Sequence, residues 1–241
     1  MSRSVLFASG KGGTGKSSLC LHVAGALARR GLRVLVVEAT PGFRGLEIAL
    51  ELPGETVYDL SDALEGRCSL GDALLVHQET QLRLIPAPED PFYLPEEKRL
   101  SAFFSWGRER WDLLFIDAPP AFPPILPMLA KLCDLGILVT TPEEVAARFA
   151  GKTSVLLARE GLAAQRLVIN RIPRDFVPTP ALRDLDDVID LCGVQLLGAL
   201  PEREGGLPPP GEEPLPGLLG QELEAIARRL LGERAELALF L

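Results

Sequence analysis

A glycine-rich segment near the N-terminus constrains the fold more than any other feature of the sequence. Residues 10–17 read Gly-Lys-Gly-Gly-Thr-Gly-Lys-Ser and fit the pattern G-x-x-x-x-G-K-[ST]. The apolar run Ser4–Ala8 before it predicts a β-strand, and the pattern of Ser17–Arg30 after it predicts a helix ended by Gly31. A strand, a glycine loop and a helix in this order form a phosphate-binding unit, because loop N–H groups and the helix N-terminus converge on an anion.

The residue types in this loop predict a bound nucleoside triphosphate, Mg-ATP. Glycines let the backbone curl so that its N–H groups point at phosphate oxygens. Lys16 is expected to reach the β- and γ-phosphates, and the Ser17 hydroxyl is expected to be a ligand of Mg²⁺. The expected ATP-binding residues of the loop are Gly10, Lys11, Gly12, Gly13, Thr14, Gly15, Lys16, Ser17 and Ser18.

Strand and helix patterns alternate along the rest of the chain. The valine-rich run Arg33–Glu38 is apolar on both faces, which is typical of a strand buried in a parallel sheet. Further strands are expected at Leu82–Ile85, Asp112–Asp117, Asp134–Thr140, Leu167–Asn170 and Val194–Leu200. Helices are expected at about Thr56–Leu64, Pro95–Arg110, Pro123–Leu132, Glu143–Glu160 and Pro180–Cys192, and a last helix stops at Gly232. Repeated β–α units predict an α/β fold with a doubly wound, mostly parallel sheet and helices on both of its faces.

Length and composition narrow the possibilities further. The chain has 241 residues, which suits one domain over residues 1–241, with the Pro- and Gly-rich stretch 202–216 as a surface loop within it. The net charge of −8 argues against strong binding to nucleic acid. No signal peptide pattern precedes the glycine loop, and no apolar stretch reaches the roughly 18 residues that span a bilayer. We therefore expect a cytoplasmic protein.

A second lysine, Lys11, stands at the start of the glycine loop. With this lysine the loop resembles the deviant Walker A loop of the MinD/ParA ATPase family, a class of P-loop NTPases. In that family the first lysine crosses a dimer interface and contacts the phosphates held by the partner subunit. The resemblance therefore implies an ATP-dependent homodimer in which ATP lies between the two subunits.

Other segments extend the resemblance from about residue 4 to about residue 232. They are Tyr58–Leu70, Val139–Glu143, Leu167–Pro173 and Leu197–Glu202. Within the family the chain looks closer to MinD than to ParA. The resemblance implies that Asn170 hydrogen-bonds adenine and that Arg171 and Pro201 line the base pocket. It also implies an ATPase that positions part of the cell-division machinery, with a protein partner that is a MinC- or MinE-like or other regulator.

The position after the second expected strand departs from the family pattern. Family members usually carry an Asp-x-Asp arrangement there, and this chain reads Glu38-Ala39-Thr40. Glu38 keeps a carboxylate that can act near Mg²⁺. Thr40 stands where the family has an acid linked to the lytic water, and a hydroxyl holds water but accepts a proton less readily.

A second departure lies after the expected strand Asp112–Asp117. Asp117 itself matches the Walker B logic of a carboxylate partner for Mg²⁺. Ala121 stands where the family usually has glycine, and alanine restricts the backbone if a positive φ is needed. We therefore expect slow ATP hydrolysis. The expected catalytic residues are Lys11, Lys16, Thr40 and Asp117, and the expected metal-site residues are Ser17, Glu38 and Asp117.

The C-terminal residues also differ from the family pattern. MinD proteins usually continue into a basic amphipathic helix that lies in the membrane surface. Residues Gly232–Leu241 contain one arginine and two glutamates, so the basic face that attracts anionic lipid is missing. We expect this tail to pack on the fold. Contact at the inner face of the cell membrane would then need a partner, with Leu237–Leu241 adding to it.

Three other functions are compatible with the same loop. A pseudo-ATPase adaptor would bind ATP without cycling, and measured turnover would separate it from an ATPase. A ParA-like partitioning protein would bind DNA in an ATP-dependent, salt-sensitive way, against which the acidic balance counts. A ligase related to dethiobiotin synthetase would need a carboxylate or amine substrate pocket, and the sequence reveals none.

Overall fold

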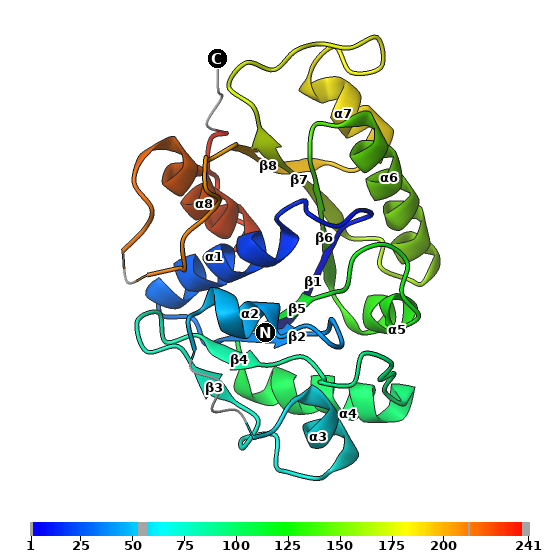
Figure 1. Ribbon diagram of the computed structural model, residues 1–241, viewed down its shortest axis with the longest axis vertical. Helices are drawn as coiled ribbons and strands as arrows, with labels where there is room; N and C mark the ends of the chain where they lie inside the picture. Colours follow the sequence, from blue (N-terminus) through cyan, green and yellow to red (C-terminus); the bar gives the residue numbers. More distant parts are fainter. Residues whose placement is uncertain (1, 53–56, 212, 238–241) are drawn as a thin grey trace.

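The computed structural model describes residues 2–52, 57–211 and 213–237 of the chain. At its centre lies one sheet with the strand order β3-β4-β2-β5-β1-β6-β7-β8 (Figure 1). Every neighbouring pair is parallel except β3 and β4. The strands are β1 Arg3–Ala8, β2 Val34–Glu38, β3 Leu75–Val76, β4 Arg83–Ile85, β5 Leu113–Asp117, β6 Leu135–Thr140, β7 Gln165–Ile172 and β8 Leu196–Pro201.

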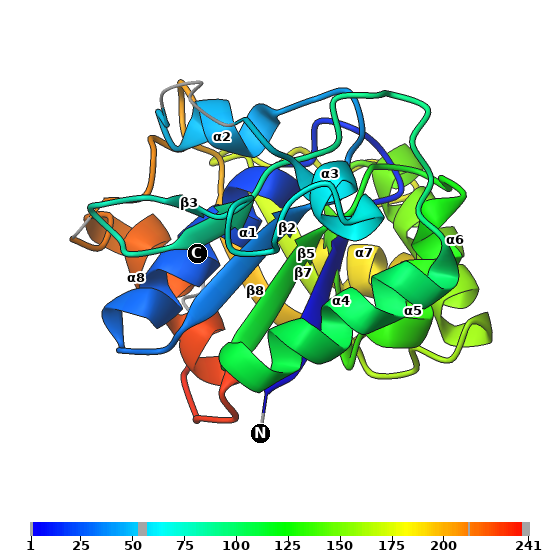
Figure 2. The ribbon, with the colours of Figure 1, turned by 90° about the horizontal axis from the view of Figure 1, so that it is seen from below.

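Helices cover both faces of this sheet (Figure 2). One layer holds α1 Lys16–Arg29, α2 Gly45–Ala49 and α8 Gly217–Leu230. The other layer holds α3 Leu60–Glu65, α4 Glu97–Arg110, α5 Ile125–Leu132, α6 Glu144–Arg159 and α7 Leu185–Cys192. The predicted fold class, doubly wound and mostly parallel, is confirmed.

The central strands are apolar on both faces because each face meets a separate core. In β1, Val5 and Phe7 pack toward α1 and α8, whereas Leu6 and Ala8 pack toward the layer of α4–α7. The alternation repeats in β2 and β5, where neighbouring side chains again belong to opposite cores. Phe7 and Phe115 join β1 to β5 with ring centroids 4.9 Å apart. Strands β1, β2 and β5 are therefore held rigidly at the middle of the molecule.

Several predicted boundaries are corrected by local hydrogen bonds. The helix expected from Thr56 begins at Leu60, because Asp59 caps it; Thr56 itself lies outside the described residues. The helix expected from Pro180 begins at Leu185, because the Asp184 side chain accepts from the N–H groups of the first turn. Strand β7 is longer than the expected Leu167–Asn170. Helix α2 and strand β3 were not predicted, and both are short.

The end of the described chain packs on α8. Arg229 donates from Nε to the carbonyl of Ala235 at 3.1 Å, and Arg228 donates from Nη2 to the carbonyl of Arg234 at 3.1 Å. Residues 238–241, which make up most of the apolar tail, lie outside the described residues. No helix within the described ranges is long and apolar enough to cross a membrane.

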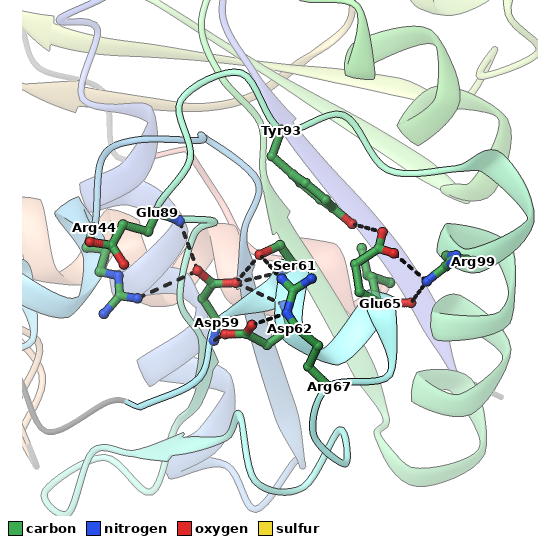
Figure 3. Close-up of polar contacts among 10 residues, drawn as sticks. Arg44, Asp59, Ser61, Asp62, Glu65, Arg67, Glu89, Tyr93 and Arg99 are labelled. Atoms are coloured by element: carbon green, nitrogen blue, oxygen red, sulfur yellow. Dashed lines mark hydrogen bonds and ion pairs between the residues drawn. The ribbon is translucent and has the colours of Figure 1, made fainter.

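Asp59 ties three segments together near the carboxyl end of β2 (Figure 3). Its Oδ1 accepts from the N–H groups of Ser61 and Asp62 and from the Ser61 hydroxyl, at 2.7, 3.1 and 2.6 Å. Its Oδ2 accepts from the N–H of Glu89 at 2.9 Å and lies 3.6 Å from Arg44 Nη2. One buried carboxylate thus fixes helix α3 against the loop after β2 and the loop after β4.

Replacing Asp59 with alanine is expected to lower the free energy of unfolding by about 1–2 kcal/mol at neutral pH, as for a lost helix cap. Burial alone would raise the pKa of Asp59, but hydrogen bonds from Ser61, Glu89 and Asp62 hold it below its ordinary value. Because the folded-state pKa is the lower one, this stabilisation is complete above the unfolded pKa of about 4 and is lost as pH falls through the folded pKa.

Urea unfolding of wild type and Asp59→Ala at several pH values measures this difference. Asp175→Ala, in the exposed loop after β7, is the control and is expected to change little. A difference between wild type and Asp59→Ala that grows as the solution is acidified would contradict the assignment.

Candidate functional site

The glycine loop connects β1 to α1 at the carboxyl edge of the sheet. Gly13 and Gly15 have φ of 81° and 84°, in the left-handed region that favours glycine. Gly15 is also the N-cap of α1, and no side chain of the described residues caps the helix there. The N–H groups of the first turn of α1 are therefore available to an anion.

Strand register brings three functional positions together. Phe7 of β1 and Glu38 of β2 both pair with Asp117, the last residue of β5. The glycine loop follows β1 directly, so Asp117 lies beneath it. In such sheets ligands usually bind in a crevice at the carboxyl ends of the strands. The crevice lies where the chain reverses its direction of winding between neighbouring strands.

Lys16, Ser17 and Asp117 form a buried polar cluster in that crevice. Lys16 Nζ lies 2.5 Å from Asp117 Oδ1, and the Ser17 hydroxyl donates to Asp117 Oδ2 at 2.7 Å. Lys16 Nζ is also 3.1 Å from Ser17 Oγ. Lys16 and Asp117 are only 6% and 1% exposed. The lysine and hydroxyl predicted to hold phosphate and Mg²⁺ are thus adjacent, and both contact the predicted Walker B carboxylate.

Glu38 lies beside Asp117 but is engaged elsewhere. Its Oε1 accepts from the N–H groups of Gly45 and Leu46 at 2.8 and 3.1 Å, so it caps helix α2. Its Oε2 is buried and has no hydrogen-bond partner among the described residues. Burial raises the pKa of Glu38 to about 7, and the Asp117 charge adds to the rise, while the N–H groups of Leu46, Gly45 and Ala87 oppose it.

Thr40 and Ala121 lie in the two loops that leave β2 and β5. Thr40 is half-buried, two residues beyond Glu38. Ala121 has φ of 68°, so alanine occupies a left-handed conformation that costs an L-residue roughly 1–2 kcal/mol. Its N–H donates to the carbonyl of Ser9 at 2.9 Å. Alanine is therefore in the positive-φ conformation that restricts it, as expected. Its N–H is already hydrogen-bonded to the residue that follows β1.

Lys11, in contrast to Lys16, lies at the surface. Its Nζ is 2.7 Å from Glu143 Oε2, and the two side chains are 46% and 58% exposed. Exposed pairs of this kind contribute little stability, so Lys11 can exchange its partner readily. Lys11 and Glu143 both line a pocket of about 230 Å³ above the loop, together with Gly12, Gly13, Thr14, Thr141, Pro142, Arg171, Pro173 and Glu202.

The three residues predicted to bind the base meet on the other side of the loop. Asn170 donates from Nδ2 to the carbonyl of Thr14 at 2.8 Å, and Arg171 follows it with φ of 57°. A Cβ at Gly15 would lie 2.3 Å from Asn170 Nδ2, which explains the glycine. A second pocket is lined by Gly15, Ser18, Asn170, Arg171, Pro201, Arg203, Gly206, Leu207 and Leu219.

Some residues at the site were not identified from the sequence. A Cβ at Gly10 would lie 2.4 Å from the backbone carbon of Phe149, so the loop packs directly on α6. Arg203, Gly206 and Leu207 line the second pocket, but the sequence marked their segment only as a surface loop. Glu143, the partner of Lys11, was noted only as part of a family pattern. Glu143 follows β6, which lies beside β1, and this position could have predicted a contact with the glycine loop after β1.

The arrangement fits Mg-ATP. The Thr14 hydroxyl is buried in the loop without a hydrogen-bond partner among the described residues, as is Glu38 Oε2. No group of three His, Cys, Asp or Glu side chains in the described ranges could hold a metal by itself. Magnesium in nucleotide sites commonly uses one or two protein oxygens with phosphate oxygens and water, which Ser17 and Asp117 can provide.

Comparison with known proteins agrees with this geometry. The family model described as CobQ/CobB/MinD/ParA nucleotide binding domain matches residues 5–206. The chain belongs to this family. The septum site-determining protein MinD of Synechocystis sp. is 31% identical, over 97% of this chain and 91% of that protein. MinD of Bacillus subtilis is 30% identical, over 98% of this chain and 92% of that protein.

Solved structures give the same result. The MinC:MinD cell division protein complex of Aquifex aeolicus has a TM-score of 0.84 and 26% identity, covering 98% of both chains. MinD of Pyrococcus horikoshii, solved with Mg-ADP, has a TM-score of 0.81 and 25% identity, covering 95% of this chain and 96% of that one. The chain is therefore a MinD-like member of a nucleotide-binding P-loop ATPase family.

Proposed function

We propose that this protein is an ATP-dependent positioning switch of MinD type, which forms an ATP-sandwich homodimer and acts in division-site selection. The observation that carries the proposal is the contrast between the two lysines of one loop. Lys16 is buried against Asp117 in the crevice, and Lys11 is exposed at its rim. A lysine that faces outward from a phosphate loop is placed to serve a nucleotide held by a second subunit.

The chain's own residues would act as follows. Lys16 leaves Asp117 and pairs with the β- and γ-phosphates, where the loop N–H groups and the first turn of α1 also bind. Ser17 supplies a hydroxyl ligand to Mg²⁺, and Asp117 and Glu38 orient the shell around it. Bound Mg²⁺ would neutralise charge on the phosphate oxygens. Asn170, Arg171 and Pro201 hold adenine.

Hydrolysis is proposed to be slow. Thr40 cannot accept a proton from water as a carboxylate does, and general-base assistance is typically worth about 10²–10⁴-fold. Ala121 holds its N–H on Ser9 and occupies a strained conformation. The same two positions favour a second candidate, a pseudo-ATPase adaptor that binds ATP and seldom hydrolyses it.

A protein partner is part of the proposal. The Aquifex aeolicus structure is a MinC:MinD complex, which supports a MinC-like or other regulator for this chain. We propose that the protein is cytoplasmic and forms a single domain over residues 1–241. It would reach the inner face of the membrane through such a partner. The Borrelia burgdorferi plasmid partition protein shares only the fold, at 17% identity, so a DNA-partitioning role gains no support from it.

Replacing Lys11 with alanine is expected to abolish the ATP-dependent dimer and to leave ATP binding by the monomer nearly unchanged, because Lys11 lies outside the buried cluster. Size-exclusion chromatography with light scattering, in ATP and in ADP, measures the first effect, and calorimetry measures the second. Lys98→Ala, exposed on α4, is the matched control and should dimerise as wild type does. An ATP-dependent dimer that survives Lys11→Ala would refute the sandwich arrangement.

Restoring a carboxylate at position 40 is expected to raise ATP turnover by about 10-fold or more, since it supplies the missing proton acceptor. Phosphate release by Thr40→Asp is compared with wild type on the same preparation. Thr179→Asp, in an exposed loop, controls for the added charge. Wild-type turnover already equal to that of Thr40→Asp would show that Thr40 does not limit hydrolysis.

A further inference from the structure

One face of helix α1 is covered by the Pro- and Gly-rich segment that follows β8. Ser18, His22, Gly25 and Arg29 are spaced four, three and four residues apart and so share a single face of the helix. Residues 203–211, called here the strap, run along this face in the orange part of Figure 1. The face begins at the phosphate loop, because Ser18 lies in the first turn of α1.

Two hydrogen bonds and one close contact hold the strap to α1. His22 Nε2 lies 2.9 Å from the carbonyl oxygen of Pro208. Arg29 Nη1 donates to the carbonyl of Gly211 at 3.1 Å. Between them Pro210 packs over Gly25, where an added Cβ would lie 3.4 Å from Pro210 Cβ, at van der Waals contact.

The strap is stiff for reasons that its sequence explains. Pro208, Pro209 and Pro210 have fixed φ angles, which restrict the backbone of this half of the strap, and their lack of N–H groups leaves no hydrogen bond within the run. The other half of the strap is a turn in which Gly206 N–H donates to the carbonyl of Arg203 at 3.1 Å. A stiff segment fixed at one end transmits its position to the other end, so the α1 contacts set where the turn lies.

His22 is suited to be the fixing donor. Its side chain is 6% exposed, and burial lowers its pKa, so the ring is neutral near pH 7. The Pro208 carbonyl can only accept, so Nε2 must carry the hydrogen. Among the contacts that join the strap to α1, it lies nearest in sequence to the turn.

The turn end of the strap forms a wall of the pocket beside the phosphate loop. Arg203, Gly206 and Leu207 of the strap line it together with Gly15, Ser18 and Asn170. Leu207 supplies an apolar side chain, and Arg203, whose Nη1 donates to the Gly206 carbonyl at 3.2 Å, supplies a planar guanidinium. With the Asn170 amide in the same lining, these groups suit a flat heteroaromatic ring with polar edges. A group bound there would be continuous with phosphates bound at α1.

We propose that the strap closes the base half of the nucleotide site, with Leu207 and Arg203 facing the purine and His22 acting as the positioning residue that holds the strap. This inference rests on the proposed binding of ATP. The inference goes further than ATP binding, because it makes the affinity for the base depend on His22 of α1, whose side chain bonds to the strap.

The test separates the base from the phosphates. Calorimetric titrations with Mg-ATP and with Mg-tripolyphosphate, which lacks a base, are compared for wild type, His22→Ala and His22→Gln. His22→Ala is expected to weaken Mg-ATP binding about 5- to 10-fold, as for one lost hydrogen bond, and to leave tripolyphosphate binding within about two-fold. His22→Gln retains an N–H donor and is expected to recover most of the ATP affinity.

Leu207→Ser provides a second variant, on the half-buried part of the strap itself, that removes neither hydrogen bond between the strap and α1. It should weaken ATP and spare tripolyphosphate in the same way, whereas Val155→Ser, exposed on α6 in the opposite layer, should change neither. Equal losses for both ligands in His22→Ala, or unchanged ATP binding in both His22→Ala and Leu207→Ser, would overturn the inference. Wild type that binds neither ligand would instead refute the proposed function itself.

Discussion

The buried contact of Lys16 and Ser17 with Asp117 is the interaction around which the site is arranged. A charged pair that is 6% and 1% exposed loses most of its hydration, and such pairs persist only when additional hydrogen bonds satisfy them. Ser17 supplies one of these bonds. Lys16 can pair with a phosphate in place of Asp117, so the buried lysine would keep an anionic partner when nucleotide binds. The pair is therefore a resting arrangement from which nucleotide can be bound.

The phosphate loop is braced from several directions at once. Gly10 packs on α6 of one helical layer, and the loop continues into α1 of the other layer. The Thr14 carbonyl accepts from Asn170 at the end of β7. The helical layers on the two sides of the sheet thus both contact one loop. A change in the conformation of the loop on ligand binding would therefore alter the packing of both layers. The strap adds a fourth contact, through its attachment to α1.

Much of this could be predicted from the sequence because the determinants are local. Val34–Val37 of the predicted strand are apolar because both faces of that strand are covered, and the loop motif specifies its own residues. Helix α2 could not be predicted, because it is five residues long and its cap comes from Glu38 of the preceding strand. The contact of His22 with Pro208 could not be predicted either, since nothing in the spacing links two residues that are 186 positions apart. The sequence predicted that Ala121 restricts the backbone only if a positive φ is needed there, and the observed φ is positive.

The exchange of Lys16 from Asp117 to phosphate is tested most directly by calorimetric titration of Mg-ATP into wild type and Lys16→Gln, with folding checked by circular dichroism. Lys152→Ala, on α6, is the control. If Lys16 carries the phosphates, wild type and Lys152→Ala bind Mg-ATP alike and Lys16→Gln loses at least about 100-fold in affinity, as for removal of a buried charged contact. Folded Lys16→Gln that binds Mg-ATP as tightly as wild type would contradict the assignment of this cluster as the nucleotide site.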